Sequence, residues 1–357
     1  MKHKHEKKLI NNSKLLKSTI IIFIILIILL GFIILLLNLY VDSKLGKLKQ
    51  ERITNDTEEL GIREANSDES SEMSNYRNIA ILGLDSRYDT YDNDYRTDCI
   101  MIASINKNTN DIQLYSIYRD TYVYMEMDNQ IKFDKINHAY YNGIENTIKT
   151  INKNLDLNVT EYIISDFSAL ADLIDQIGGI EIKIDSEEIK YINDYIKDVS
   201  KVVGKRSSLI ENTGLQKLNG IQAVAYCRIR YTSGMDYKRT ERMRTVINKV
   251  IDKIKSLDIT QMLELLDIIL PNIRTNISTE EIKKMIPQAL NFNFTKSFGW
   301  PYETEGIYLK GDFFGPAKTL ESNVKKLHQE VYNQKNYNVP EEIKQISEQI
   351  IKETGVK

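Results

Sequence analysis

The feature that most restricts this chain is an uninterrupted apolar segment near its start. Residues 20–37 contain only Ile, Leu, Phe and one Gly. As a helix rising ~1.5 Å per residue they would extend ~27 Å, about the hydrocarbon thickness of a bilayer. A buried core helix usually has a polar face, and a signal peptide has a shorter apolar region followed by a small-residue cleavage site; neither is found. We therefore predict an uncleaved transmembrane anchor over residues 19–41.

The charged flanks of this segment predict its orientation. Six lysines precede it, whereas Lys44, Lys47, Lys49 and Arg52 follow it closely. Basic residues are retained on the cytoplasmic side of a membrane. We therefore expect a single-pass protein of the cell membrane, with residues 1–18 as a cytoplasmic tail and residues 42–357 outside.

Composition divides the outer part into three regions. Residues 42–75 are rich in charged residues, Ser and Asn, without a lasting apolar period, which predicts a short helical stalk that fades into a flexible linker. Residues 76–332 alternate apolar runs with turn residues and form the predicted folded domain. Residues 333–357 are polar, and we expect a frayed helical tail there.

Apolar periodicity within the domain predicts strands interspersed with helices, which is an α/β layered fold. Asp166 is a candidate helix cap, and Gly178 and Gly179 are candidate helix terminators. Strands are predicted over residues 78–84, 99–105, 112–118, 162–165, 180–184 and 225–231, and helices over residues 167–177, 237–255 and from 278 to about 287.

Charged residues gather at the ends of these predicted strands, the rim where α/β sheets tend to place ligands. Pairs of residues two apart are expected to share one face of a strand. The charged residues are Asp85 and Arg87, Arg96 and Asp98, Arg119 and Asp120, Arg228 and Arg230, and, at the start of the long helix, Arg239, Arg242 and Arg244.

This set of charges points to a phosphate ligand. Arg239 falls within the apolar stripe of its helix and therefore needs a buried partner. Surface salt bridges could explain any one arginine, but several arginines that face one way repel each other unless an anion joins them, and the guanidinium fork fits phosphate oxygens. Asp85 and Asp98 could hold Mg²⁺ (or Mn²⁺), which prefers one or two carboxylates plus substrate phosphates. The pattern predicts a pyrophosphate bound with a divalent cation.

The balance of charges argues against a nucleic-acid-binding surface. The 48 basic and 50 acidic residues give no basic field for nucleic acid.

Cys99 and Cys227 are expected to be small buried hydrophobes, with a disulfide between them as the alternative. His138 is expected to be structural. Phe298, Trp300 and Tyr302 are expected to anchor a loop, with sugar stacking as the alternative.

Seven motifs occur in a characteristic order. They are Ile81-Leu-Gly-Leu-Asp-Ser-Arg87, Arg96-Thr-Asp98, Ser116-Ile-Tyr-Arg-Asp-Thr121, Lys135-Ile-Asn-His-Ala-Tyr140, Asp175-Gln-Ile-Gly-Gly-Ile180, Leu218-Asn-Gly-Ile-Gln-Ala-Val-Ala-Tyr-Cys-Arg-Ile-Arg230 and Asp236-Tyr-Lys-Arg-Thr-Glu-Arg242. With these motifs the chain resembles the LytR-CpsA-Psr family of cell-wall ligases, strongly over residues 76–255 and more loosely over residues 256–332.

The resemblance implies a layered α-β-α domain with a central mixed sheet and an apolar tunnel for a polyprenyl tail. It implies transfer of a phosphate-linked glycopolymer (teichoic acid, capsule or another secondary wall polysaccharide) from a polyprenyl-pyrophosphate carrier to a peptidoglycan sugar hydroxyl. Asp85, Asp98 and Arg119 would be catalytic, and the two aspartates would hold the metal. The residues implied to contact pyrophosphate or to order its surroundings are Arg87, Arg96, Arg228, Arg230, Arg239 and Arg242.

Three departures from the family pattern accompany this resemblance. Tyr118 stands where Pro is usual, Met243 stands where Gln is common, and Asn142-Gly143 replaces a Gly pair. None of them removes a charge. Two other functions remain open: a non-catalytic polyprenyl-pyrophosphate binding or regulatory envelope protein, and a lipid pyrophosphatase. A DNA-binding role is not expected, since the sequence shows no helix-turn-helix or basic reading surface.

Overall fold

The computed structural model describes residues 40–64, 72–84, 97–128, 130–230, 232, 235–289 and 291–357. The chain divides into two compact units, Met1–Lys47 and Leu48–Lys357. In the first, the described part is a short helix over residues 40–45 followed by a turn. The predicted tail 1–18 and all but the last two residues of the predicted anchor 19–41 lie outside the described residues. Within the described ranges, no helix is long and apolar enough to cross a membrane.

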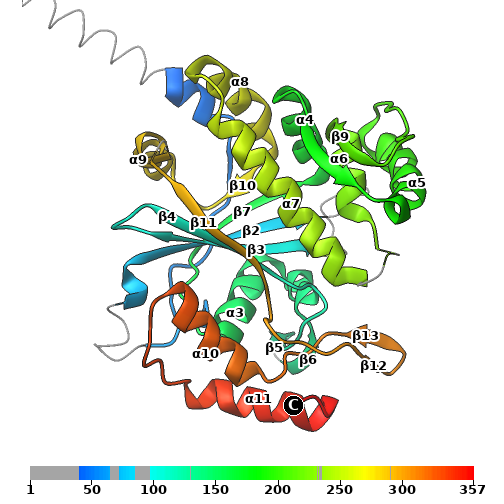
Figure 1. Cartoon of the computed structure of the whole chain (residues 1–357). Helices are drawn as coiled ribbons and strands as arrows, with labels where there is room; N and C mark the ends of the chain where they lie inside the picture. Colours follow the sequence, from blue (N-terminus) through cyan, green and yellow to red (C-terminus); the bar gives the residue numbers. More distant parts are fainter. Residues whose placement is uncertain are drawn as a thin grey trace, which may run out of the picture. The chain divides into compact units, whose positions relative to one another are not determined.

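A seven-stranded mixed sheet forms the centre of the second unit (Figure 1). Strand β2 is antiparallel to β3 and parallel to β7, so the expected central mixed sheet is confirmed. The two strands predicted over residues 99–105 and 112–118 are also confirmed, and they pair antiparallel as β3 and β4. In spatial order the strands are β1 (Lys49–Gln50), β10 (Arg274–Thr275), β7 (Glu161–Asp166), β2 (Tyr76–Leu84), β3 (Thr97–Asn106), β4 (Asp111–Ile117) and β11 (Asn293–Trp300).

Helices cover both faces of this sheet, and three small two-stranded sheets lie around it (Figure 1). The helices are η1 (Ile136–Asn142), α3 (Gly143–Leu155), α4 (Phe167–Gln176), α5 (Ser186–Val203), α6 (Gly220–Arg228), α7 (Met235–Lys255), α8 (Ile259–Ile269), η2 (Leu270–Asn272), α9 (Thr279–Ala289), α10 (Leu320–Val331) and α11 (Glu341–Thr354). The hairpins join β5 (Tyr122–Met127) to β6 (Gln130–Lys135) and β12 (Ile307–Leu309) to β13 (Asp312–Phe314), whereas β8 (Ile180–Ile184) pairs with β9 (Gly214–Leu218) across the intervening helix α5.

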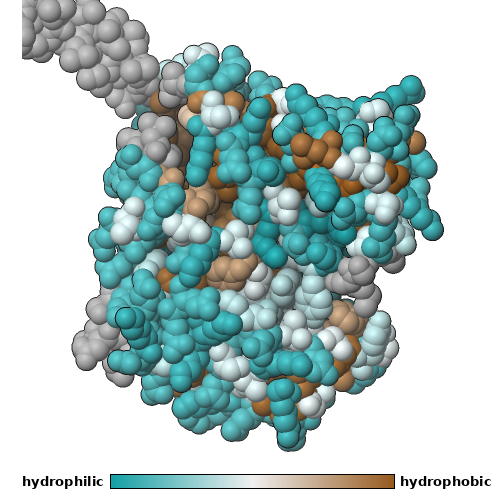
Figure 2. All heavy atoms as spheres, viewed as in Figure 1, coloured by the Kyte–Doolittle hydropathy of each residue, from teal (hydrophilic) through white to brown (hydrophobic). Residues whose placement is uncertain are grey.

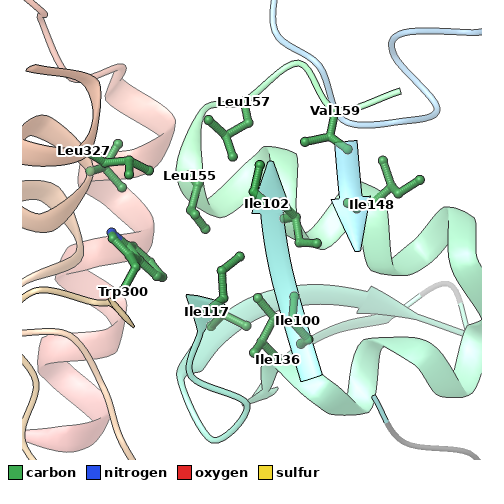
Figure 3. Close-up of a cluster of buried hydrophobic side chains, with 14 of the residues drawn as sticks. Ile100, Ile102, Ile117, Ile136, Ile148, Leu155, Leu157, Val159, Trp300 and Leu327 are labelled. Atoms are coloured by element: carbon green, nitrogen blue, oxygen red, sulfur yellow. The ribbon is translucent and has the colours of Figure 1, made fainter. Parts of the chain in front are cut away.

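The two faces of the sheet belong to two separate apolar cores. Side chains of a strand alternate between faces. Ile100 and Ile102 of β3 therefore enter the core formed with α3, α10 and α11, where Figure 3 shows them close to Ile117 and Ile136. Met101 and Ala103 enter the other core, formed with α4, α6 and α7.

The predicted strand over residues 225–231 is wrong. Residues 220–228 instead form helix α6, which begins with a capping box: the Asn219 side chain accepts from the Gln222 amide, and the Gln222 side chain accepts from the Asn219 amide. Gly220 to Cys227 are all buried, so the segment lacks the polar face that marks a surface helix. Arg228 and Arg230 consequently do not share a strand face, since Arg228 ends the helix and Arg230 lies beyond it.

The predicted strand–helix–strand unit of residues 162–184 is confirmed in its elements but not in its pairing. Asp166 accepts the amide of Ala169 and caps α4, and Gly178 and Gly179 follow the helix with φ of 78° and 84°. Strand β8, however, pairs only with β9 and lies outside the central sheet.

Parts of the predicted linker and tail also belong to the folded unit. In the linker, β1 pairs with β10, and Leu60 is 1% exposed in the core of α3, α10 and α11. After residue 333, helix α11 buries Ile343, Ile346 and Ile350 in the same core, so the expectation of a frayed tail is wrong. Their i, i+3, i+7 spacing is that of an amphipathic helix, within an otherwise polar composition.

Candidate anion-binding site at the mouth of an apolar cavity

An apolar cavity of about 460 Å³ lies on the face of the sheet that α4, α7, α8 and α9 cover. Alternate residues of β3 from Cys99 to Ile105 line it, so it follows the strand for roughly 20 Å. Met243, Ile247 and Ile251 line it from α7 at intervals of four residues, which places them on one side of the helix. Figure 2 shows apolar surface in the recess between α7 and the α9–β11 segment. A long apolar cavity of this kind fits an extended hydrocarbon chain.

The polar end of the cavity lies where β2 and β7 end. Gly83, Ser165, Asp166 and Cys99 line it there. A side chain at Gly83 would place its Cβ 2.9 Å from the Cβ of Cys99, so glycine permits β2 and β3 to approach closely at this point. The side chains of the two neighbouring strand ends therefore meet at one mouth.

A β-bulge directs Asp98 to this mouth. Gly83 pairs with Cys99 and Leu84 pairs with Thr97, which leaves Asp98 opposite no residue of β2. A bulge interrupts the strict alternation of side chains and re-aims the extra residue. Asp98 thereby reaches the first turns of α7.

Three arginines converge on the Asp98 carboxylate. Arg119 Nη1 lies 2.6 Å from Oδ1, Arg239 Nη2 lies 2.5 Å from Oδ2, and Arg230 Nη2 lies 3.4 Å from Oδ2. The Asp98 side chain is 4% exposed. Burial by itself would raise the pKa of Asp98, but the charges of the three arginines outweigh it and hold the pKa well below its usual range. The carboxylate is therefore ionised at any physiological pH.

Positive charge exceeds negative charge in this cluster. Asp120 adds a second carboxylate, whose Oδ2 lies 3.6 Å from Arg119 Nε. Even so, within the described part of the chain, three guanidinium groups share two acids. An anion placed among them would gain charge-assisted hydrogen bonds from donors that are already held in position.

Arg242 and Arg228 lie beside this cluster in different surroundings. Arg242 is 5% exposed and bonds to Glu188 Oε1 at 2.8 Å, Thr232 Oγ1 at 2.6 Å and the carbonyl of Ile229 at 3.2 Å. It holds the backbone that carries Arg230, and so orders the surroundings of the cluster. Arg228 ends α6, with its guanidinium carbon 6.0 Å from the Phe167 ring and 5.9 Å from the Tyr195 ring.

Arg244, which belongs to the charged set identified in the sequence, is a further cation near the mouth, although the family resemblance assigned it no role. Its Nη1 is buried and has no hydrogen-bond partner among the described residues. Burial lowers the pKa of Arg244, and Tyr118, which hydrogen-bonds it, only partly offsets this. Burial raises the pKa of the Cys99 thiol, and the positive charges of Arg239 and Arg244 partly offset this, so both guanidinium groups lie near this cavity-lining residue. Its place at the edge of the apolar stripe of α7 was the available sequence signal.

The departure at Tyr118 has a structural explanation. Its ring packs edge-on to Tyr237 with centroids 4.9 Å apart. A Cβ on Gly299 would lie 2.2 Å from the Tyr118 hydroxyl, so the glycine leaves room for this ring. The side chain thus fills the space between the Arg119 turn, the start of α7 and β11.

The structure bears on the metal prediction only through Asp98, because Asp85, Arg87 and Arg96 lie outside the described residues. Within those residues, no group of three or more His, Cys, Asp or Glu side chains could hold a metal ion. Asp98 suits one ligand position: it is ionised, and its Oδ1 accepts a single hydrogen bond, from Arg119. A carboxylate oxygen has two lone pairs, so one remains.

The remaining candidates have structural roles. Cys99 and Cys227 are free thiols that line the cavity, so the disulfide alternative does not hold, and burial raises the pKa of Cys99 to about 12. His138 Nδ1 lies 2.8 Å from Asp134 Oδ2. Phe298 and Trp300 belong to strand β11 rather than to a loop; Trp300 is fully buried and Phe298 stacks on Tyr302, so these rings pack within the domain.

The sequence is similar to known transferases. The LytR_cpsA_psr family profile matches residues 35–329. The polyisoprenyl-teichoic acid–peptidoglycan teichoic acid transferase TagU of Enterococcus faecalis is 28% identical over 72% of this chain and 79% of its own length. The transferase of the same description from Bacillus subtilis, TagT, is 28% identical over 64% of this chain and 70% of its own.

Solved structures share the fold. TagT bound to LI-WTA superposes with a TM-score of 0.58 at 22% identity, covering 79% of this chain and 98% of that chain. The LytR-CPS2A-psr family protein YwtF (TagT) with bound octaprenyl pyrophosphate lipid gives a TM-score of 0.54 at 20% identity, with the same coverage. At this identity the likeness establishes the α/β architecture.

Proposed function

The chain belongs to the LytR_cpsA_psr family, and on this basis we propose that it is a transferase that moves a phosphate-linked glycopolymer from a polyprenyl-pyrophosphate carrier to peptidoglycan. The names of TagU and TagT, which describe transfer of teichoic acid from a polyisoprenyl carrier, support this reaction class. Teichoic acid is therefore the first polymer to test, with capsule and other secondary wall polysaccharides as further members of the same class.

The observation that carries this proposal is the junction between the apolar cavity and the arginine cluster. Cys99 lines the cavity, and its neighbour Asp98 binds three arginines. A polyprenyl pyrophosphate has the same two parts in the same order, a long apolar chain followed directly by two phosphates. The chain would occupy the cavity while the phosphates lie among the guanidinium groups.

The reaction follows from this placement. A sugar hydroxyl of peptidoglycan attacks the phosphorus that carries the polymer. A new phosphorus–oxygen bond forms, the bond to the lipid phosphate breaks, and polyprenyl phosphate leaves with the bonding electron pair. Arg119, Arg230 and Arg239 would stabilise negative charge on the phosphoryl oxygens, which is the main requirement of phosphoryl transfer.

Asp98 positions these arginines rather than taking the proton of the acceptor. Both of its oxygens are bonded to guanidinium groups, and its lowered pKa makes it a weak base. Asp85 is the remaining predicted carboxylate for that step. The hydroxyl proton would pass to Asp85 or to solvent as the new bond forms.

We include a divalent cation, Mg²⁺ or Mn²⁺, in the proposal. Asp98 would bind it through the unused lone pair of Oδ1, together with Asp85 and phosphate oxygens. When bound, the ion would neutralise charge on the transferred group.

We also propose that the protein is a single-pass membrane protein with its catalytic domain outside. The apolar segment 20–37 and the six lysines that precede it support this orientation. A membrane location would also place the cavity within reach of a lipid substrate.

The test is an in vitro transfer assay with the full chain in detergent micelles, a labelled lipid-pyrophosphate teichoic acid precursor and nascent peptidoglycan. We expect attachment in the wild type, loss of attachment with retained lipid binding in Asp85→Asn, and the same loss on chelation with EDTA. Lys249→Ala, an exposed position on α7, is the matched control and should keep full activity.

The competing functions give different results in the same assay. Tight lipid binding with no attachment by the wild type would favour a non-catalytic binding or regulatory protein. Release of the polymer as a free phosphate, with no attachment, would favour a lipid pyrophosphatase. Full activity of Asp85→Asn in EDTA would remove the metal from the mechanism.

A further inference from the structure

The hairpin β12–β13 carries a pair of aromatic rings, of which Tyr308 is exposed to solvent and Phe313 is half-buried. Tyr308 and Phe313 are cross-strand partners, with ring centroids 5.7 Å apart and ring planes inclined by 70°. Tyr308 is 69% exposed, which is unusual for a large side chain. Lys310 and Gly311, with φ of 52° and 91°, form a tight two-residue turn that fixes this register.

The opposite face of the hairpin attaches it to the domain. Ile307 and Phe314 are paired and point inward, where the Phe314 ring contacts the Tyr122 ring with centroids 5.1 Å apart. A Cβ on Gly306 would lie 2.7 Å from the Phe313 ring, so that ring lies directly on bare backbone. The hairpin is therefore held without the outward face of Tyr308, which leaves that ring available to a ligand.

The hairpin is tied to the arginine cluster at its base. The amide of Gly315, which follows β13, donates to the carbonyl of Asp120 at 2.9 Å, and Asp120 directly follows Arg119. Phe313 precedes Gly315 by two strand residues, or roughly 7 Å. Figure 1 shows the hairpin below the end of α7 at which Arg239 lies. The base of the hairpin is thus bonded to the turn that carries Arg119, and Phe313 is two residues from that base.

We propose that Tyr308 and Phe313 form a sugar-binding surface for the glycan strand of the peptidoglycan acceptor. This inference rests on the proposed function, since it concerns the second substrate of that reaction. A sugar ring has apolar C–H faces and a hydroxyl rim, and it stacks on an aromatic ring while its rim meets polar groups. The exposed Glu305, Lys310 and Asp312 supply such groups around the rings.

Size and position argue against other occupants. A stable protein interface buries about 800 Å² per partner. Two aromatic side chains supply roughly 150–250 Å² each, which suits a few sugar units better than a protein. The second unit begins at β1, and the hairpin follows β11; these are the two edge strands of the sheet, roughly 29 Å apart. The rings are therefore distant from the point where the membrane-proximal segment would enter the unit.

The experiment measures acceptor binding separately from transfer. The full chain in detergent micelles is titrated with a soluble tetrasaccharide of alternating N-acetylglucosamine and N-acetylmuramic acid, and the Michaelis constant for peptidoglycan is measured in the transfer assay. We expect Tyr308→Ser to weaken tetrasaccharide binding and raise that constant by about 3- to 10-fold. Tyr308→Phe should behave as the wild type, because the stacking face is retained.

A matched control is Leu215→Ser, since Leu215 is a similarly exposed apolar residue, at 67%, on β9. It should change neither the affinity for the tetrasaccharide nor the Michaelis constant for peptidoglycan. No variant should change the affinity for the lipid donor. Unchanged tetrasaccharide affinity in Tyr308→Ser, or no binding by the wild type, would overturn the inference. So would loss of binding to phosphatidylglycerol vesicles without a change in tetrasaccharide affinity, which would assign the rings to a membrane surface.

Failure of the proposed function has a separate signature. If the wild type binds the tetrasaccharide through Tyr308 but attaches no polymer, the sugar-binding surface stands and the transfer reaction fails. If the wild type attaches polymer and Tyr308→Ser keeps the wild-type Michaelis constant, the reaction stands and the surface fails.

Discussion

The two faces of the central sheet are equally buried but differently filled. Along β3, Ile102 is 0% exposed on one face and Met101 is 1% exposed on the other. Ile102 lies in a continuous core with Trp300 and Leu327 (Figure 3), whereas Met101 lines the cavity of about 460 Å³. Low solvent exposure therefore does not by itself mean close packing.

The charges near the two faces differ in the same way. Beside the filled core, Arg63 meets Asp156 one to one through two hydrogen bonds, of 3.1 and 3.0 Å, and the Tyr337 hydroxyl donates a further one to Asp156 at 2.6 Å. At the mouth of the hollow face, three arginines share Asp98. An apolar cavity beside a cluster of arginines indicates a site that a ligand completes, because protein cores are close-packed and buried charges need partners.

The largest expected loss of stability comes from a substitution at the charged mouth of the apolar cavity. Asp98→Asn removes the carboxylate that the buried Arg239, which is 1% exposed, contacts, and should lower the free energy of unfolding by about 3–5 kcal/mol. Urea denaturation measures this loss. Asp252→Asn, an exposed position on α7, is the control and should change stability little.

The same group predicts how stability depends on pH. The pKa of Asp98 is lowered in the folded state, so its contribution is fully present above the unfolded value of about 3.9 and is lost as the pH falls toward the folded value. The stability difference between wild type and Asp98→Asn should therefore shrink below about pH 4. A difference that stays constant through this range would show that the ion pairs are not formed in solution.

A smaller difference in stability should distinguish the filled face of the sheet from the face that borders the cavity. Ile102→Ala should cost about 2–5 kcal/mol, because it opens a new cavity in a filled core. Met101→Ala should cost at least about 1 kcal/mol less, because the side chain already borders empty space. Equal losses for the two variants in urea denaturation would mean that the two faces are packed alike.

Replacing Arg244 should weaken binding of the lipid pyrophosphate without lowering the stability of the fold. Arg244→Gln removes a buried cation that has no carboxylate partner among the described residues, so stability should not fall. If the guanidinium contacts a carrier phosphate, affinity for polyprenyl pyrophosphate should fall by about 1.5–3 kcal/mol, or about 10- to 100-fold. Isothermal titration against Lys249→Gln as control tests this, and wild-type affinity in Arg244→Gln would remove it from the site.

The smallest expected effect on stability comes from a substitution that partly fills the apolar cavity. Ala103→Leu extends a side chain into the cavity and should change the free energy of unfolding by less than about 1.5 kcal/mol. It should nevertheless reduce the amount of polyprenyl lipid that co-purifies with the protein, measured by mass spectrometry. A loss of stability as large as that of Ile102→Ala would show that no usable space exists there.

Much of the fold could be predicted because its signals are local. The apolar runs of β2, β3 and β4, the Asp166 cap of α4 and the stripe of α7 are each written within a few neighbouring residues. Asp98, Arg119, Arg230 and Arg239 also occur in ordered motifs, and the structure brings these four side chains together. Arg239 was also correctly expected to need a buried partner.

Only the tertiary structure decided which partner each charged residue takes. Arg239 and Arg242 lie on one helix, three residues apart, yet one pairs with Asp98, 141 residues away, and the other with Glu188, 54 residues away. The bulge that aims Asp98 depends on pairing with β2, and the helical state of residues 220–228 depends on burial from all sides. Local periodicity shows which face of an element is apolar, but the neighbour that this face meets is set by packing between segments distant in sequence.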